Sequence, residues 1–227
     1  GMGGHAAGEV ASRIAIETVD ELLARKRALP DDIPGTLRSI VQEANQRIAD
    51  RIKQSPECAG MGTTLVIAAV SGSTVWLAHV GDSRAYILHD GAIRQLTSDH
   101  SFVNELVRLG MLTAEQASRD PRRNVVTRAL GSDPSVVPDV IEEECEPGDV
   151  LLLCSDGLNT MLRDEQILQA MSMAPEDLED ACRQLVSGAN DAGGEDNITV
   201  VLAQPVGHEA PDVQADPMPF RSDDSPL

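Results

Sequence analysis

The chain has 227 residues, of which 41% are apolar, and its 37 acidic and 18 basic side chains give a net charge of −19. Such an excess of negative charge is repelled by phosphate backbones, which argues against nucleic-acid binding as the main activity. No apolar run approaches the roughly 20 residues of a membrane-spanning helix, and the N-terminus lacks the form of a signal peptide. Four cysteines without metal-site spacing favour free thiols, so we expect a soluble, cytoplasmic protein.

Two amphipathic helices are predicted first, over about residues 9–27 and 36–55, because apolar residues recur there at helical spacing. The pattern then changes to β-branched runs that alternate with turn signals. We expect these runs to pair as two hairpins, residues 63–71 with 73–80 and residues 83–89 with 92–96. The second hairpin turns at Asp90-Gly91, a dipeptide typical of two-residue β-turns.

Residues 98–123 break the strand pattern and are helical in places. Thr113 to Gln116 resembles a capping box, which predicts a short helix beginning there. The densest positive charge in this acidic chain follows, at Arg119, Arg122 and Arg123. These arginines fit a solvated basic loop, or a surface that receives a phosphorylated partner beside an acidic site.

Two further strands are expected at residues 136–143 and 149–155, paired across Glu146-Pro147-Gly148. The second of them is continuously apolar, which is typical of a central strand that is covered on both faces. The remaining elements are helices at about 164–173 and 176–190 and a last strand at 197–203. This order indicates an α+β domain over residues 1–204, with sheets between helical layers, followed by a disordered, acidic and proline-rich tail over 205–227.

Three aspartates stand in glycine-containing turns at strand ends, namely Asp82, Asp156 and Asp196. Paired strands deliver their ends to one edge of a sheet, so these carboxylates can converge. Clusters of oxygen ligands suit hard cations such as Mg²⁺ or Mn²⁺ better than zinc. An aspartate beside a glycine is also a common turn former, so the residue types alone leave both interpretations open.

Six motifs in order resemble the bacterial branch of the metal-dependent protein phosphatases, the PPM or protein phosphatase 2C (PP2C) family. They are Gly1-Met-Gly-Gly-His-Ala-Ala-Gly-Glu-Val-Ala-Ser12, Gly60-Met-Gly-Thr-Thr-Leu65, Ala78-His-Val-Gly-Asp-Ser-Arg-Ala85, Leu96-Thr-Ser-Asp-His100, Cys154-Ser-Asp-Gly-Leu158 and Gly194-Glu-Asp-Asn-Ile-Thr199. The resemblance covers the chain from residue 1 to about 203. It implies a PP2C-like central β-sandwich flanked by pairs of α-helices, and hydrolysis of phosphoserine and phosphothreonine on proteins by a metal-activated water.

The resemblance also implies roles for individual residues. Asp156 and Asp196 would bind one ion of a Mn²⁺ or Mg²⁺ pair, the backbone carbonyl of Gly1 would bind the other, and Asp82 with Asp156 would hold a third ion. The segment from about Asp99 to Arg123 would be a flap beside the substrate path, with Asp99, Arg119, Arg122 and Arg123 as candidate substrate residues. The expected partners are phosphorylated proteins, the substrates of a Ser/Thr kinase.

The sequence as given departs from the family pattern at its start. Family members carry an ion-bridging aspartate directly before the glycine that is Gly1 here, and first strands upstream of it. We therefore expect a chain shortened at its N-terminus, weak or absent activity, and an unpaired sheet edge that favours association, for example as a dimer. The alternative function is a non-catalytic phosphoprotein-binding regulator on the same fold.

Overall fold

The computed structural model describes residues 1–2, 5–24, 30–173 and 177–204, and the tail predicted over 205–227 lies outside them. Its helices are α1 (His5–Ala24), α2 (Ile33–Gln54), the 3₁₀ turn η1 (Pro56–Cys58), α3 (Phe102–Arg108), α4 (Ala114–Arg119), α5 (Asp156–Asn159), α6 (Asp164–Met173) and α7 (Leu178–Asp191). Its strands are β1 (Leu65–Ser71), β2 (Thr74–Val80), β3 (Arg84–His89), β4 (Ala92–Gln95), β5 (Asp139–Glu144), β6 (Val150–Cys154) and β7 (Val200–Ala203). The predicted α+β class is confirmed.

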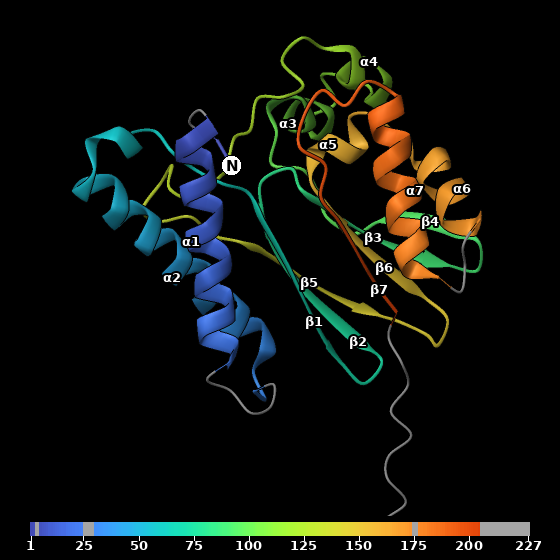
Figure 1. Cartoon of the computed structure of the whole chain (residues 1–227), viewed down its shortest axis with the longest axis horizontal. Coiled ribbons are helices and arrows are strands. Elements are labelled where there is room, and N and C mark those ends of the chain that lie inside the picture. The colour runs from blue at the N-terminus through green and yellow to red at the C-terminus, as the bar shows by residue number, and fades with distance from the viewer. Residues whose placement is uncertain (3–4, 25–29, 174–176, 205–227) are drawn as a thin grey trace, which may run out of the picture.

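Two antiparallel sheets lie face to face between two helical layers (Figure 1). The first has the strand order β1-β2-β5 and the second β4-β3-β6-β7. Helices α1 and α2 cover the first sheet, and α6 and α7 cover the second (Figure 1). A mainly aliphatic core fills each helix–sheet layer, and a third cluster, with Leu77 and Leu151, fills the space between the sheets. This is the layered sandwich that the resemblance implied.

Local sequence signals explain where several elements begin. Asp32 caps α2, because its carboxylate accepts a hydrogen bond from the Gly35 N–H at 2.8 Å. Thr113 and Gln116 form the predicted capping box at the start of α4. Asp90 and Gly91 both have positive φ, 47° and 73°, as the two-residue turn between β3 and β4 requires.

The expected pairing of the two strands around Glu146-Pro147-Gly148 is wrong. Strand β5 pairs with β2 in the first sheet, whereas β6 pairs with β3 and β7 in the second. The intervening turn therefore carries the chain from one sheet to the other. The physical reason lies in β6, whose apolar side chains require a central position with both faces covered, while the glutamate-rich β5 is suited to an edge.

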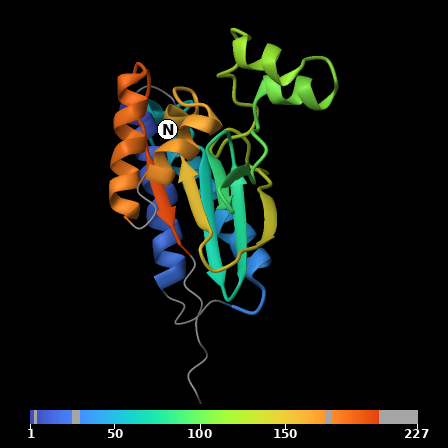
Figure 2. The ribbon, with the colours of Figure 1, turned by 90° about the vertical axis from the view of Figure 1, so that its right-hand side faces the viewer.

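Strands β1 and β7 each pair with one neighbour only, and Val70 and Val201 on them are exposed. All four cysteines are free, as expected. Among the described residues, no helix combines the length and the apolar character that crossing a bilayer would demand. Helices α3 and α4 project from one end of the sandwich, the end at which the N-terminus and α5 also lie (Figures 1 and 2).

Candidate metal centre

Asp82 lies just after β2, in a turn made by Gly81, whose φ is 110°. Its carboxyl group is buried, and among the described residues no other side chain donates a hydrogen bond to it. Burial, followed by the negative charges of Asp156 and Asp99, raises the pKa of Asp82 to about 6. An acidic group in this environment favours a bound cation or a proton.

Asp156 follows the central strand β6 and opens α5. Burial and the neighbouring Asp196 raise the pKa of this half-buried carboxyl group, while the Gly157 N–H and the N-terminal amino group act in the opposite direction. Asp82 and Asp156 line the same cavity, and Asn197, which follows Asp196, places its carbonyl against Gly157, so the three carboxylates lie at one end of the sandwich, together with the chain start at Gly1. We call these three carboxylates the carboxylate centre.

The loop that carries Asp196 is attached to the residue before Asp156. The Ser155 hydroxyl donates to the Asn197 carbonyl at 2.9 Å and accepts from the Thr199 N–H at 3.0 Å. The Ser155 N–H in turn donates to the Thr199 carbonyl at 3.1 Å. These bonds set the position of Asp196 relative to Asp156.

Gly1 is held by backbone contacts. Met2 and Gly62 exchange two hydrogen bonds, of 2.7 and 3.1 Å, which anchor the start of the chain to the segment before β1. Gly1 and Gly8 approach so closely that a β-carbon on either would collide with the other's backbone. The two glycines therefore allow the chain start to lie against α1, near Asp156.

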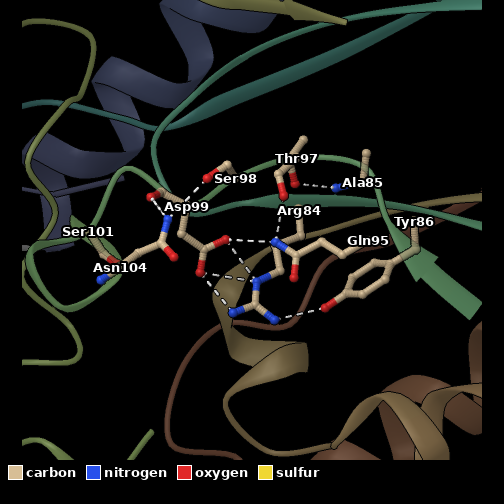
Figure 3. Close-up of polar contacts among 9 residues, drawn as sticks. All are labelled: Arg84, Ala85, Tyr86, Gln95, Thr97, Ser98, Asp99, Ser101 and Asn104. Atoms are coloured by element: carbon tan, nitrogen blue, oxygen red, sulfur yellow. Dashed lines mark hydrogen bonds and ion pairs between the residues drawn. The ribbon is translucent and has the colours of Figure 1, made fainter. Parts of the chain in front are cut away.

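Asp99 lies beside the carboxylate centre but is fully engaged by an arginine (Figure 3). Arg84 donates to both carboxylate oxygens of Asp99 at 2.8 to 3.1 Å, and its third nitrogen donates to the Tyr86 hydroxyl at 2.9 Å. The Arg84 side chain is 23% exposed and that of Asp99 is 15% exposed. Burial alone would lower the pKa of Arg84, but the bonds to Asp99 outweigh it and raise that pKa.

A cavity of about 470 Å³ adjoins the carboxylate centre. Asp82 and Asp156 line it, helices α3 and α4 form one wall, and Arg123 and Arg163 also face it. Arg119 and Arg122 do not line it: Arg119 pairs with Glu115 at 3.1 Å, and Arg122 pairs with Asp120 at 2.8 Å. The structure thus separates Arg123 from the other two arginines of the predicted basic cluster.

Among the described residues, the group of three potential ligands whose donor atoms all lie within 4.8 Å of one another is His79, His100 and Asp139, whereas the three members of the carboxylate centre lie further apart. His100 and Asp139 already have hydrogen-bond partners within the protein, whereas neither ring nitrogen of His79 has one among the described residues. The Gly81 N–H donates to Nδ1 of His100, and Nε2 of that ring lies 3.2 Å from Asp139 and 3.0 Å from Nη1 of Arg128. Arg128 also donates to Asp139, at 2.7 Å, and brings a positive charge into the group. The contacts of His100, Asp139 and Arg128 form a hydrogen-bonded network, and the charge of Arg128 disfavours a cation beside Asp139.

A larger cavity of about 700 Å³ lies between the β3–β4 hairpin and the β5–β6 turn. Its acidic residues include Glu143, which pairs with Arg94 at 2.7 Å, and Asp149, which pairs with His89 at 2.7 Å. The carboxylate centre is different, because neither Asp82 nor Asp156 forms an ion pair among the described residues and burial with acidic neighbours raises the pKa of both. Oxygen donors in such an arrangement fit Mn²⁺ or Mg²⁺.

Sequence reasoning missed three residues at this end of the molecule. Arg84 stands in a quoted motif, but nothing in the sequence indicated its pairing with Asp99. Nothing in the sequence marked Arg163, in the short connection between α5 and α6, as a residue of the site. Gly157 could have been suspected from Asp156-Gly157, although the close backbone approach that requires it comes from the distant Asn197.

Comparison with known proteins gives one consistent result. Residues 1–203 match the family model described as protein phosphatase 2C. The chain is 40% identical over 206 residues to the serine/threonine phosphatase stp of Listeria monocytogenes, covering 90% of this chain and 81% of that protein. It is also similar to the crystal structure of serine/threonine phosphatase Stp1 from Staphylococcus aureus, with a TM-score of 0.85, 37% identity, and coverage of 91% and 81% of the two chains.

A further similar structure is the catalytic domain of the serine/threonine protein phosphatase PstP in complex with two manganese ions. Its TM-score is 0.80 at 38% identity, and the match covers 89% of this chain and 84% of that one. The family match over nearly all the described residues agrees with the fold and with the six ordered motifs. The chain therefore belongs to the protein phosphatase 2C family.

Proposed function

We propose that this protein removes phosphate from phosphoserine and phosphothreonine side chains of proteins in a reaction that depends on Mn²⁺ or Mg²⁺. The observation that supports it most directly is that Asp82 and Asp156 line one cavity, with Asp196 near enough to Asp156 to raise its pKa. Membership of the PP2C family and the serine/threonine phosphatases among its relatives point to the same activity.

We assign the ligands as the resemblance implies. Asp156 and Asp196 would hold one ion, the Gly1 carbonyl would hold a second, and Asp82 with Asp156 would hold a third. Ions held by these residues would supply a water molecule activated for in-line attack and would polarise the phosphoryl oxygens. Their charge would also offset that of the carboxylates, so that a chain of net charge −19 could accept an anionic substrate.

The protein's own residues would shape the substrate path. The Arg84–Asp99 pair lines the cavity beside the carboxylate centre and is held in place, because both side chains are largely buried and bonded to each other. The α3–α4 segment forms a wall, and it presents Arg123 to the cavity. Arg119 and Arg122 lie on the same segment but are each paired with an acidic neighbour, so of the three arginines we assign Arg123 to the substrate path.

The direct test is release of phosphate from a phosphothreonine peptide with and without Mn²⁺, comparing the chain with Asp156→Asn and Asp82→Asn variants. Asp90→Asn is the matched control, because Asp90 is 93% exposed in the β3–β4 turn and asparagine tolerates its positive φ. We expect the first two substitutions to reduce turnover and the control to leave it unchanged. Phosphopeptide binding without phosphate release in any form would instead support the non-catalytic regulator.

We also propose that an aspartate at the position directly before Gly1, where the resemblance places one, would help to hold the ion pair together with the Gly1 carbonyl. Adding a single aspartate ahead of Gly1 should raise both Mn²⁺ affinity, measured by calorimetry, and turnover. An added asparagine is the control for chain length. Equal effects of the two additions would contradict this assignment.

We also propose that the protein can dimerise, that it is cytoplasmic, and that it binds neither nucleic acid nor a membrane. Dimerisation through the exposed edges of β1 or β7 is consistent with their single strand neighbours and with Val201, which is 50% exposed. A cytoplasmic location is consistent with four free cysteines. Neither nucleic acid nor a membrane is an expected partner, because the chain is strongly acidic. Light scattering at high protein concentration tests the dimer, and a monomer would contradict it.

A further inference from the structure

Two arginines face the cavity of the carboxylate centre without an acidic partner. Arg123 comes from the segment after α4, and Arg163 comes from the connection between α5 and α6, so they reach the cavity from different elements. Both are exposed, and neither guanidinium has an ion pair or a hydrogen-bond acceptor among the residues that the structure describes. Their positive charge is therefore available to a molecule that enters the cavity.

Other arginines near this cavity are already paired with acidic side chains. Arg84, which also lines the cavity, is fully used by Asp99 and Tyr86. Arg119 and Arg122, close in sequence to Arg123, are paired with acidic neighbours, and Arg122 also lies over the Phe102 ring. Arginines elsewhere also lack partners, Arg108 among them, but Arg123 and Arg163 are those that line the cavity of Asp82 and Asp156.

We propose that Arg123 and Arg163 recognise a second anionic group of the substrate, on a residue that flanks the phosphorylated one. The proposal rests on the proposed phosphatase function and adds a substrate preference to it. A guanidinium binds a carboxylate or a phosphate through two parallel N–H bonds, so glutamate, aspartate or a second phosphorylated residue can supply the group. A substrate with neutral flanking residues leaves both arginines solvated, so they add nothing to its binding affinity.

The cavity itself supports a flanking group as the ligand. It contains about 470 Å³, and it extends from Asp82 and Asp156 along α3 and α4 to residues such as Ser118 and Asn124. That lining is longer than a single phosphoryl group needs. Polar side chains from Asn104, Ser118, Asn124 and Asn159 also line it and can accompany an extended peptide.

The test measures binding, so that it does not depend on turnover. Fluorescein-labelled peptides carry a non-hydrolysable phosphonate analogue of phosphothreonine, flanked by alanine, by glutamate or by a second such analogue. Dissociation constants are measured by anisotropy with Mn²⁺ present, for the unmodified chain and for Arg163→Gln, Arg123→Gln and Arg108→Gln. Arg108 is the matched control, because it is exposed on α3, lies outside the cavity lining and carries the same charge.

We expect acidic flanks to tighten binding to the unmodified chain by about three- to tenfold over alanine flanks. Arg163→Gln and Arg123→Gln should each reduce the ratio of the dissociation constants for alanine-flanked and acid-flanked peptides towards one. Arg108→Gln should leave this ratio unchanged. The preference should also weaken as salt rises from about 0.05 to 0.3 M, since exposed charges are screened. Comparing the glutamate and phosphonate flanks shows which anion is preferred.

Several outcomes overturn the inference. An equal loss of affinity for all three peptides would mean that the arginines bind the primary phosphate. An unchanged ratio in both variants, with Mn²⁺-dependent hydrolysis of para-nitrophenyl phosphate intact, would remove the flank assignment while the phosphatase function stands. Absence of both peptide binding and hydrolysis would overturn the function and this inference together.

Discussion

The carbonyl oxygen of Asn197 lies against the α-carbon face of Gly157, where an added β-carbon would fall only 2.4 Å from it. Gly157 belongs to α5, directly after Asp156, and Asn197 directly follows Asp196. The absence of a side chain at Gly157 therefore sets how closely two members of the carboxylate centre approach.

We predict that Gly157→Ala displaces the loop of Asp196 and weakens Mn²⁺ binding by about tenfold or more, with a loss of about 1–3 kcal/mol in the free energy of unfolding. The clash is with backbone atoms of Asn197, which cannot rotate away. Titration calorimetry with Mn²⁺ and urea unfolding measure the two effects. Gly188→Ala in α7 is the control, because its β-carbon would meet only Leu162 at 3.6 Å and should stabilise the helix by about 0.5–1 kcal/mol. Unchanged Mn²⁺ affinity in Gly157→Ala would contradict this account.

Asp82 should make the metal-free chain less stable as the pH rises. Its pKa is about 6 in the folded protein against 3.8 ordinarily, so the folded state binds more protons between these values. The free energy of unfolding should therefore fall from about pH 4 to pH 6, by up to about 3 kcal/mol from this group.

Asp82→Asn removes that dependence. In EDTA at pH 7 we expect the variant to unfold at a higher urea concentration than the unmodified chain, with the difference shrinking towards pH 4. Saturating Mn²⁺ should favour the unmodified chain, because a ligand bound to the folded state stabilises it. If Asp82→Asn is less stable than the unmodified chain in EDTA at pH 7, the burial argument is wrong.

His79 should have the opposite pH dependence. It is fully buried, neither of its ring nitrogens has a hydrogen-bond partner among the described residues, and it stacks on His100 with ring centroids 4.3 Å apart. Burial, followed by the neighbouring His100, lowers its pKa from 6.5 to about 4. The neutral ring is favoured in the folded state, so stability is retained above pH 6.5 and lost as the pH falls towards 4.

We predict that His79→Phe is as stable as the unmodified chain or more stable, because it removes two unpaired buried polar atoms. Its free energy of unfolding should also fall less than that of the unmodified chain between pH 6.5 and 4, as measured by urea unfolding at each pH. His79→Leu provides a smaller side chain in case phenylalanine is too large. His89→Gln is the control: hydrogen bonding to Asp149 raises the pKa of His89, so its stabilising effect is lost as the pH rises. Steeper acid destabilisation in both His79 variants would refute the prediction.

The sequence signals that succeeded here are local ones. The capping box at Thr113 and the turn at Asp90-Gly91 are each decided within a few residues, and both are confirmed. The hairpin predicted around Pro147 is wrong because the same turn residues serve a connection between two sheets. Only the pairing partners of β5 and β6, which lie elsewhere in the chain, distinguish the two cases.

Contacts between distant residues limit prediction of the site in the same way. Ordered motifs pointed to Asp82, Asp156 and Asp196, and the structure brings these three carboxylates to one end of the sandwich. Their roles as metal ligands remain a prediction. The stacking of His79 on His100 and the placement of Arg163 depend on packing between elements, which no spacing in the sequence expresses.

The Arg84–Asp99 pair should contribute more to stability than any exposed ion pair of the chain. Removing one partner of a largely buried pair leaves an uncompensated charge, so Arg84→Met should cost about 3–5 kcal/mol, and it also deprives the Tyr86 hydroxyl of its donor. Arg84→Lys should cost less, because the charge remains while the two-pronged geometry is lost.

Arg94→Met is the control, since Arg94 pairs with Glu143 at 2.7 Å but its side chain is 60% exposed, and we expect a cost of about 0–1 kcal/mol. Urea unfolding of the three variants and of Arg84→Met/Asp99→Leu measures these costs. The double variant should recover part of the loss, because the unpaired carboxylate is gone. Similar losses for Arg84→Met and Arg94→Met would show that burial does not strengthen the Arg84–Asp99 pair.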